Sequence, residues 1–201
     1  GEAGGIEKSK GGAKVAGRGL GDAWSASVVY DSKKFVAGIG YDKAIPSAFA
    51  GRGTLNASAP EVTGGVAGSA FAAADTLRAV GRVNLNNGLA LKALYQTSEV
   101  ADVQGNDAAA AAIDDAQGWL VGAEYNLPTA KAWTVKAQYS QNSTSLKTPK
   151  DDFDAQQFIA GADYAFTKQV KAYGYAGILT LEQASFETKQ PVVGTGIEYK
   201  F

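Results

Sequence analysis

The feature that most constrains this chain is a period of two in its hydrophobicity, repeated over segments of about ten residues. In the first such segment Trp24, Ala26 and Val28 alternate with Ser25 and Ser27. Successive side chains of a β-strand point to opposite faces, so this period predicts strands with one apolar and one polar face. We expect an all-β fold of about nine strands, at 24–30, 35–41, 77–85, 89–96, 119–126, 133–140, 158–166, 170–181 and 191–201.

The connections between the predicted strands alternate in length. Asn87 and Gly88 form a strong signal for a tight turn, because both residue types tolerate positive φ. Short turns at one rim and long loops at the other are typical of an outer-membrane β-barrel, with the short turns on the periplasmic side. The predicted short joins are 31–34, 86–88, 127–131 and 167–169, and the predicted long joins are about 43–75, 99–117, 143–153 and 182–190.

Aromatic residues on the apolar faces fall near the strand ends, with Ala, Val and Ile between them. Two such rows flanking an aliphatic band are typical of strands that cross a membrane. A soluble sandwich is the alternative, but its core would favour large aliphatic residues at mid-strand, where this chain has many Ala and Gly. The aromatic pairs are Trp24 and Tyr30, Phe35 and Tyr41, Trp119 and Tyr125, Trp133 and Tyr139, and Phe158 and Tyr164.

The opposite faces of the same strands carry charged and amide side chains at mid-strand. A charge facing lipid near the midplane costs about 2–4 kcal/mol, so these side chains are expected to face water inside a closed, transmembrane antiparallel barrel. The predicted pore-lining residues are Arg78, Arg82, Lys92, Glu124, Lys136, Gln138, Gln157, Asp163 and Glu198.

The inventory of residue types excludes several functions. The 201 residues include no Cys, Met or His, which removes disulfides, soft-metal sites and His-dependent catalysis. A formal net charge of −1 gives no reason to expect nucleic acid as a partner. We therefore expect no enzyme activity, no catalytic residues and no cofactor. An enzyme working through carboxylates alone is the remaining catalytic alternative, and an adhesin or phage receptor acting through its long loops is another alternative function.

The chain ends on the alternating residues Ile197, Tyr199 and Phe201, and this ending resembles that of the general porins of Gram-negative outer membranes. The segments "DAWSASVVYD" and "FIAGADYAFTKQVKAYGYAGI" are also similar to that family. The resemblance implies a sixteen-stranded, trimeric channel for passive diffusion of small hydrophilic solutes and ions, in contact with membrane lipid and lipopolysaccharide. It also implies recognition by the barrel-assembly machinery through a C-terminal signal made of Gly194, Ile197, Tyr199 and Phe201.

The N-terminal segment differs from the family pattern. Residues 1–21 are rich in glycine and lysine and are expected to form an external loop ahead of the first strand. With 1–201 belonging to one barrel domain, we expect the chain to be the C-terminal portion of a longer porin. The constriction loop of the family would then lie in the preceding half.

Other motifs carry weaker signals. The "GRGLG" stretch at 17–21 superficially resembles a phosphate-binding loop but lacks the flanking strand and helix, so a plain loop is favoured. The run "DAAAAAID" could form a helical turn. Lysines in the first segment could contact lipopolysaccharide, although a solvated loop is the simpler interpretation. Without a complete ligand loop we expect no metal site at the remaining acidic clusters, Asp114 and Asp115 and Asp151, Asp152 and Asp154.

Overall fold

The computed structural model describes residues 23–50, 69–102, 113–147 and 152–200, and over these residues the chain is entirely β-strands and turns. Nine antiparallel strands form one sheet in which each strand pairs with its neighbours in sequence, as the alternation predicts. The strands are β1 (Trp24–Asp31), β2 (Phe35–Ala50), β3 (Ser69–Asn84), β4 (Leu89–Asp102), β5 (Ile113–Asn126), β6 (Trp133–Leu146), β7 (Phe153–Ala165), β8 (Val170–Gln183) and β9 (Phe186–Tyr199).

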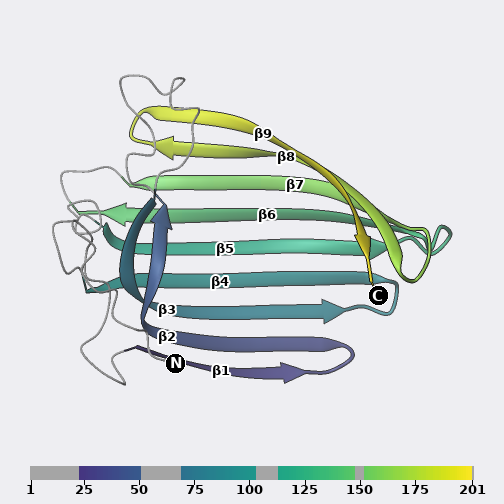
Figure 1. Ribbon diagram of the computed structural model, residues 1–201, viewed down its shortest axis with the longest axis horizontal. Helices are drawn as coiled ribbons and strands as arrows, with labels where there is room; N and C mark the ends of the chain where they lie inside the picture. Colours follow the sequence, from purple (N-terminus) through teal and green to yellow (C-terminus); the bar gives the residue numbers. More distant parts are fainter. Residues whose placement is uncertain (1–22, 51–68, 103–112, 148–151, 201) are drawn as a thin grey trace.

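The sheet is bent rather than flat. Figure 1 shows the strands side by side in chain order, with β8 and β9 curving together away from the direction of β4 and β5 towards the C-terminal end of β9. Over the described residues β1 and β9 form the two edges of the sheet and are not paired with each other. Over these residues the sheet is therefore an open, curved wall.

The short turns lie where the sequence predicts them, at 32–34, 85–88, 127–132 and 166–169. In the second turn the amide of Gly88 donates to the carbonyl of Leu85 at 3.2 Å. Gly88 has φ of 84°, and a Cβ there would lie 2.9 Å from the carbonyl oxygen of Asn126. This turn therefore requires glycine both for its backbone conformation and for its contact with the neighbouring strand.

The predicted long joins were too long, because the strands extend well into them. Strand β2 continues to Ala50 and β3 begins at Ser69, while the join expected at 182–190 is a turn of Ala184 and Ser185. Ala184 adopts φ of 53° there. The apolar pattern ends where the aromatic rows end, but backbone pairing does not depend on side-chain polarity and continues beyond them. The "DAAAAAID" run lies mostly outside the described residues, and its last two residues belong to β5.

The distal half of the β2–β3 hairpin turns away from the sheet. A register shift between Asp42 and Ile45 places a bulge on β2, and a second shift, where Ala73 and Ala74 pair with Asp102 and Val100, places one on β4. Ala44, in the first bulge, has φ of 50°. Figure 1 shows this part of the hairpin running across the direction of the other strands. Bulges increase local bending and twist, which accounts for the turn.

Asp75 fixes the geometry of that bend. Its carboxylate accepts hydrogen bonds from the amide of Ala44 at 2.9 Å and from the hydroxyl of Tyr41 at 3.3 Å, and it forms an ion pair with Lys43. These contacts satisfy the amide at the strained position of the bulge. The bend is therefore specified by side chains on both strands.

One face of the sheet, the apolar face, exposes large hydrophobic side chains. Val28, Val193 and Ile197 are 72–75% exposed. The aromatic side chains on this face pair across strands, as in Trp119 with Tyr139, whose ring centroids are 5.2 Å apart. Similar pairs across strands join Trp24 to Tyr41, Tyr30 to Phe35 and Trp133 to Tyr164, and Tyr164 also makes an edge contact with Phe166, two residues further along the chain.

Few apolar side chains of the described residues are buried. The cluster of fully buried side chains consists of Phe153 and Leu181, with Ala155 and Leu179 packed against it. Over the same residues, no helix has the length and apolarity needed to cross a membrane. An apolar face left this open argues against the sandwich alternative, in which that face would pack on a second sheet.

Candidate functional site on the polar face

Strand register brings the predicted pore-lining residues together on the opposite, polar face. Arg82 pairs with Lys92, and Glu124 pairs with Lys136. Residues that pair directly in an antiparallel sheet point to the same face, and every second residue along each strand shares it. The face so defined contains all nine predicted residues, Arg78, Arg82, Lys92, Glu124, Lys136, Gln138, Gln157, Asp163 and Glu198.

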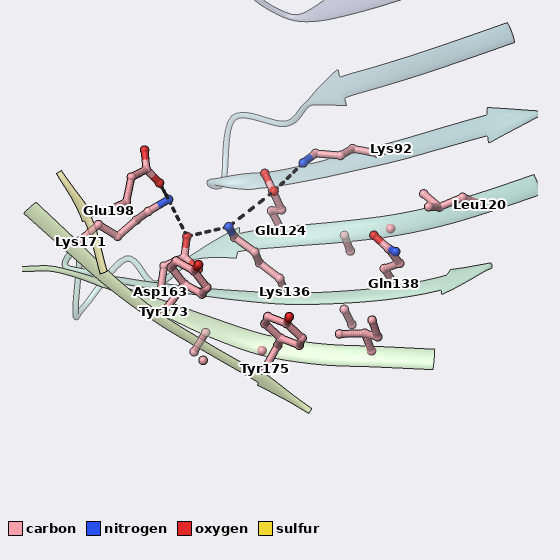
Figure 2. Close-up of a pocket in the computed structure, with 17 residues that line it drawn as sticks. Lys92, Leu120, Glu124, Lys136, Gln138, Asp163, Lys171, Tyr173, Tyr175 and Glu198 are labelled. Atoms are coloured by element: carbon pink, nitrogen blue, oxygen red, sulfur yellow. Dashed lines mark hydrogen bonds and ion pairs between the residues drawn. The ribbon is translucent and has the colours of Figure 1, made fainter. Parts of the chain in front are cut away.

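Charged side chains on this face form a continuous row of ion pairs, which we call the charge belt. Figure 2 shows the central part of the belt, with alternating lysine and carboxylate groups. Its first centre is Glu124 on β5, whose carboxylate is 2.5 Å from Lys92 Nζ, 3.6 Å from Arg82 Nη2 and 4.0 Å from Lys136 Nζ. One carboxylate on β5 thus interacts with cations from β3, β4 and β6.

The belt continues to the last strand through two further carboxylates. Asp163 Oδ2 is 2.6 Å from Lys136 Nζ and 3.2 Å from Lys171 Nζ. Glu198 is 2.8 Å from Lys171 Nζ and 3.4 Å from Lys200 Nζ. The Asp163 side chain is only 13% exposed, so it lies sunk between its two lysine partners.

The position of the belt follows from the turns. Glu124 and Asp163 each lie two residues before the end of their strand, and Lys171 is the second residue of β8. Short turns place the ends of neighbouring strands side by side. Positively and negatively charged side chains near those ends therefore lie next to one another across the sheet. Five cations and three carboxylates make up the belt, Arg82, Lys92, Lys136, Lys171 and Lys200 with Glu124, Asp163 and Glu198, so it carries an excess of two positive charges.

Three of the predicted pore-lining residues lie on the polar face but outside the belt. Arg78 donates a hydrogen bond of 2.9 Å to Gln96 and lines a separate hollow with Asp42. Gln138 lines the hollow described below. Gln157 lies on the same face, paired with Ser140 and Leu179.

Strand β8 contributes residues that the sequence prediction missed. Lys171, Tyr173 and Tyr175 all face the polar side, because they pair with Glu198, Gly196 and Gly194. In this strand the aromatic residues are on the polar face, opposite to the arrangement in the other strands, and they were not assigned to it. The signal that could have placed them is Lys171, which shares their parity along the strand.

A hollow of about 500 Å³ lies in the polar face between β4 and β9. Figure 2 shows Lys92, Glu124, Lys136, Asp163, Lys171 and Glu198 around it, together with Gln138 and the two tyrosine rings. A Cβ built on Gly194 would be 2.3 Å from Tyr175 Cζ, and one on Gly196 would be 2.5 Å from Tyr173 Cζ. Each ring therefore lies against a glycine of β9, in the space where a side chain would otherwise be.

Replacing Gly194 by alanine is expected to destabilise the folded protein by about 0.5–1.5 kcal/mol, because the added methyl group overlaps the Tyr175 ring and displaces it from its rotamer. The free energy of unfolding, measured by denaturant titration in lipid vesicles, checks this. Gly174→Ala is the matched control, since a Cβ at Gly174 would meet its nearest neighbour, Thr195 Cγ2, at 3.6 Å. Equal effects of the two substitutions would contradict the packing role of Gly194.

The residues predicted to form the C-terminal assembly signal occupy both faces. Gly194 lies on the polar face beneath Tyr175, whereas Ile197 and Tyr199 lie on the apolar face and are 75% and 60% exposed. Phe201 lies outside the described residues, as does the predicted external loop at 1–21.

The acidic clusters do not form a metal centre in the part of the chain that the structure describes, where no group of three or more potential ligands converges. Asp151 lies outside that part. Asp152 instead accepts a hydrogen bond of 2.9 Å from the amide of Leu146.

A meandering antiparallel sheet with one lipid-compatible face and one charged face is the wall of an outer-membrane β-barrel. A family model described as Gram-negative porin matches residues 2–181. The chain belongs to this Gram-negative porin family and is an outer-membrane protein.

A solved structure has a similar fold. It is a loop L8 deletion mutant of OmpT, an outer membrane protein of Vibrio cholerae, and it matches with a TM-score of 0.58 at 16% sequence identity. The match covers 88% of this chain and 53% of that chain, so the present chain spans about half the length of that protein. The search of curated proteins found no match.

Proposed function

We propose that the protein forms the wall of a water-filled channel through which small hydrophilic solutes and ions diffuse passively across the outer membrane, and that it is not an enzyme. The observation that carries this proposal is the separation of the two faces. Val28, Val193 and Ile197 are exposed on one face, while the charge belt and Arg78 occupy the other. Belonging to the porin family supports the same function.

We also propose that the nine strands belong to a single, wider barrel of the sixteen-stranded, trimeric kind. Two open edges at β1 and β9 and the half-length match to an outer-membrane protein support a wider barrel. The proposed partners are membrane lipid and lipopolysaccharide around the apolar face, and the barrel-assembly machinery for the last strand with its signal of Gly194, Ile197, Tyr199 and Phe201. Charged side chains that line a water-filled channel would then determine the electric field that acts on permeating ions.

Planar-bilayer recording of the folded protein tests this proposal. We expect stepwise increases in conductance that scale with the salt concentration, since ions pass through water rather than through a tight filter. The same preparation after heat denaturation serves as the control. The absence of steps from protein that is folded and inserted would reject the channel function.

A further inference from the structure

The two tyrosine rings in the hollow are arranged as a platform. Tyr173 and Tyr175 are two residues apart on β8, and each covers a glycine of β9, Gly196 and Gly194. They remain 38% and 39% exposed. One side of each ring is therefore packed against the protein, and the remainder is open to the hollow. Such exposed aromatic faces on a polar wall favour contact with the apolar face of a planar or cyclic solute.

The groups around the rings offer alternating donors and acceptors. Lys136 and Lys171 donate, Asp163 between them accepts, and Gln138 can do both. A hydroxyl group can also both donate and accept a hydrogen bond. A solute with several hydroxyl groups can therefore accept from the lysines and donate to the carboxylate in the same hollow.

The charges in the hollow are already partnered within the protein. Glu124 has three cations within 4.0 Å, and Asp163 has two within 3.2 Å. A charged solute would have to displace one partner of an ion pair. A neutral solute could instead hydrogen-bond to the paired groups while each ion pair stays intact. The chemistry of the hollow therefore favours an uncharged, hydroxylated molecule.

We infer that this hollow is a binding site for uncharged cyclic polyols of monosaccharide or disaccharide size, held by ring stacking on Tyr173 and Tyr175 and by hydroxyl contacts with Lys136, Asp163, Lys171 and Gln138. This inference rests on the proposed channel function and adds a solute class to it. The volume of about 500 Å³ lies within the roughly 300–1,000 Å³ of small-molecule sites.

The test titrates the folded protein with cellobiose and follows binding by calorimetry in detergent and current interruptions in planar bilayers. We expect saturable binding of cellobiose, weaker binding of the acyclic polyol sorbitol, and a loss of about two- to tenfold in affinity for each ring removed. Equal affinity for cellobiose and sorbitol would overturn the inference, because it would exclude a contribution from stacking.

Variants separate stacking from a structural role, since an aromatic side chain over a glycine on the next strand also stabilises a sheet. Tyr173→Leu with Tyr175→Leu should weaken cellobiose binding, whereas the corresponding phenylalanine variants should retain it. Gln157→Leu, on the same face outside the hollow, is the control and should bind like wild type. Unchanged affinity in the folded leucine variant would overturn the inference.

Two further results keep the outcomes distinct. If the leucine variant does not fold, Gln138→Leu tests the same site and should lower affinity about two- to tenfold through the lost hydrogen bond. Unchanged affinity there would then overturn the inference. A wild-type protein that conducts but does not bind cellobiose refutes the site alone, whereas one that binds but does not conduct refutes the proposed channel.

Discussion

Replacing Val121 by arginine is expected to lower the free energy of unfolding in a lipid membrane by about 2–4 kcal/mol. Val121 is 47% exposed on the apolar face, between Trp119 and Tyr125 on the same strand. In the membrane its side chain would lie among lipid tails, where a guanidinium group loses its hydration. Denaturant titration from phospholipid vesicles, followed by the fluorescence of the three tryptophans, measures the change.

The adjacent residue provides a matched control for this substitution. Leu120 precedes Val121 on β5 but lines the hollow in the polar face. Leu120→Arg introduces the same charge one residue away, and its unfolding free energy should stay within about 1 kcal/mol of wild type because the side chain remains in water. Equal destabilisation by the two substitutions would contradict the assignment of faces.

Removing two carboxylates from the charge belt is expected to shift the ion preference towards anions by about tenfold at low salt. The change is Glu124→Gln with Asp163→Asn, which leaves Lys92, Lys136 and Lys171 without these partners. A unit charge about 12 Å from a permeating ion in water contributes roughly 0.35 kcal/mol, with opposite sign for a cation and for an anion. The permeability ratio of the two ions therefore changes by about 0.7 kcal/mol, or about threefold, for each charge. Two such charges together give about tenfold. Reversal potentials in a salt gradient measure the ratio.

The salt dependence and a distant ion pair serve as controls for the belt. At 1 M salt the screening length falls to about 3 Å, so the shift should nearly vanish. Glu187→Gln also removes one carboxylate, but from an exposed pair with Lys189 at the other end of β9, and should leave the reversal potential unchanged. A double variant with the wild-type ratio at low salt would show that the belt does not line the ion path.

The hydrophobic pattern was sufficient to predict the strands and, except in β8, which face of each strand is polar, because both depend on local alternation. Trp119 and Val121 on one side, with Glu124 on the other, follow from a period of two that each strand carries in its own sequence. The tight turns could also be predicted from the sequence. In the turn at 85–88, for example, Asn87 and Gly88 specify the backbone conformation locally. The lengths of the loops could not be predicted in this way, because the pairing of β2 with β3 continues beyond Tyr41 through alanine-rich segments that have no regular apolar–polar alternation.

The sequence by itself determined the number of strands, the apolar–polar alternation along each strand and which side chains of a strand share a face, since these properties arise from bond geometry within each strand. Only the tertiary structure decided which charges meet. Lys136 contacts Asp163 and Glu124 because the register between β5, β6 and β7 brings strand ends level. Register is set by pairing between strands, and so is the packing of Tyr175 against Gly194.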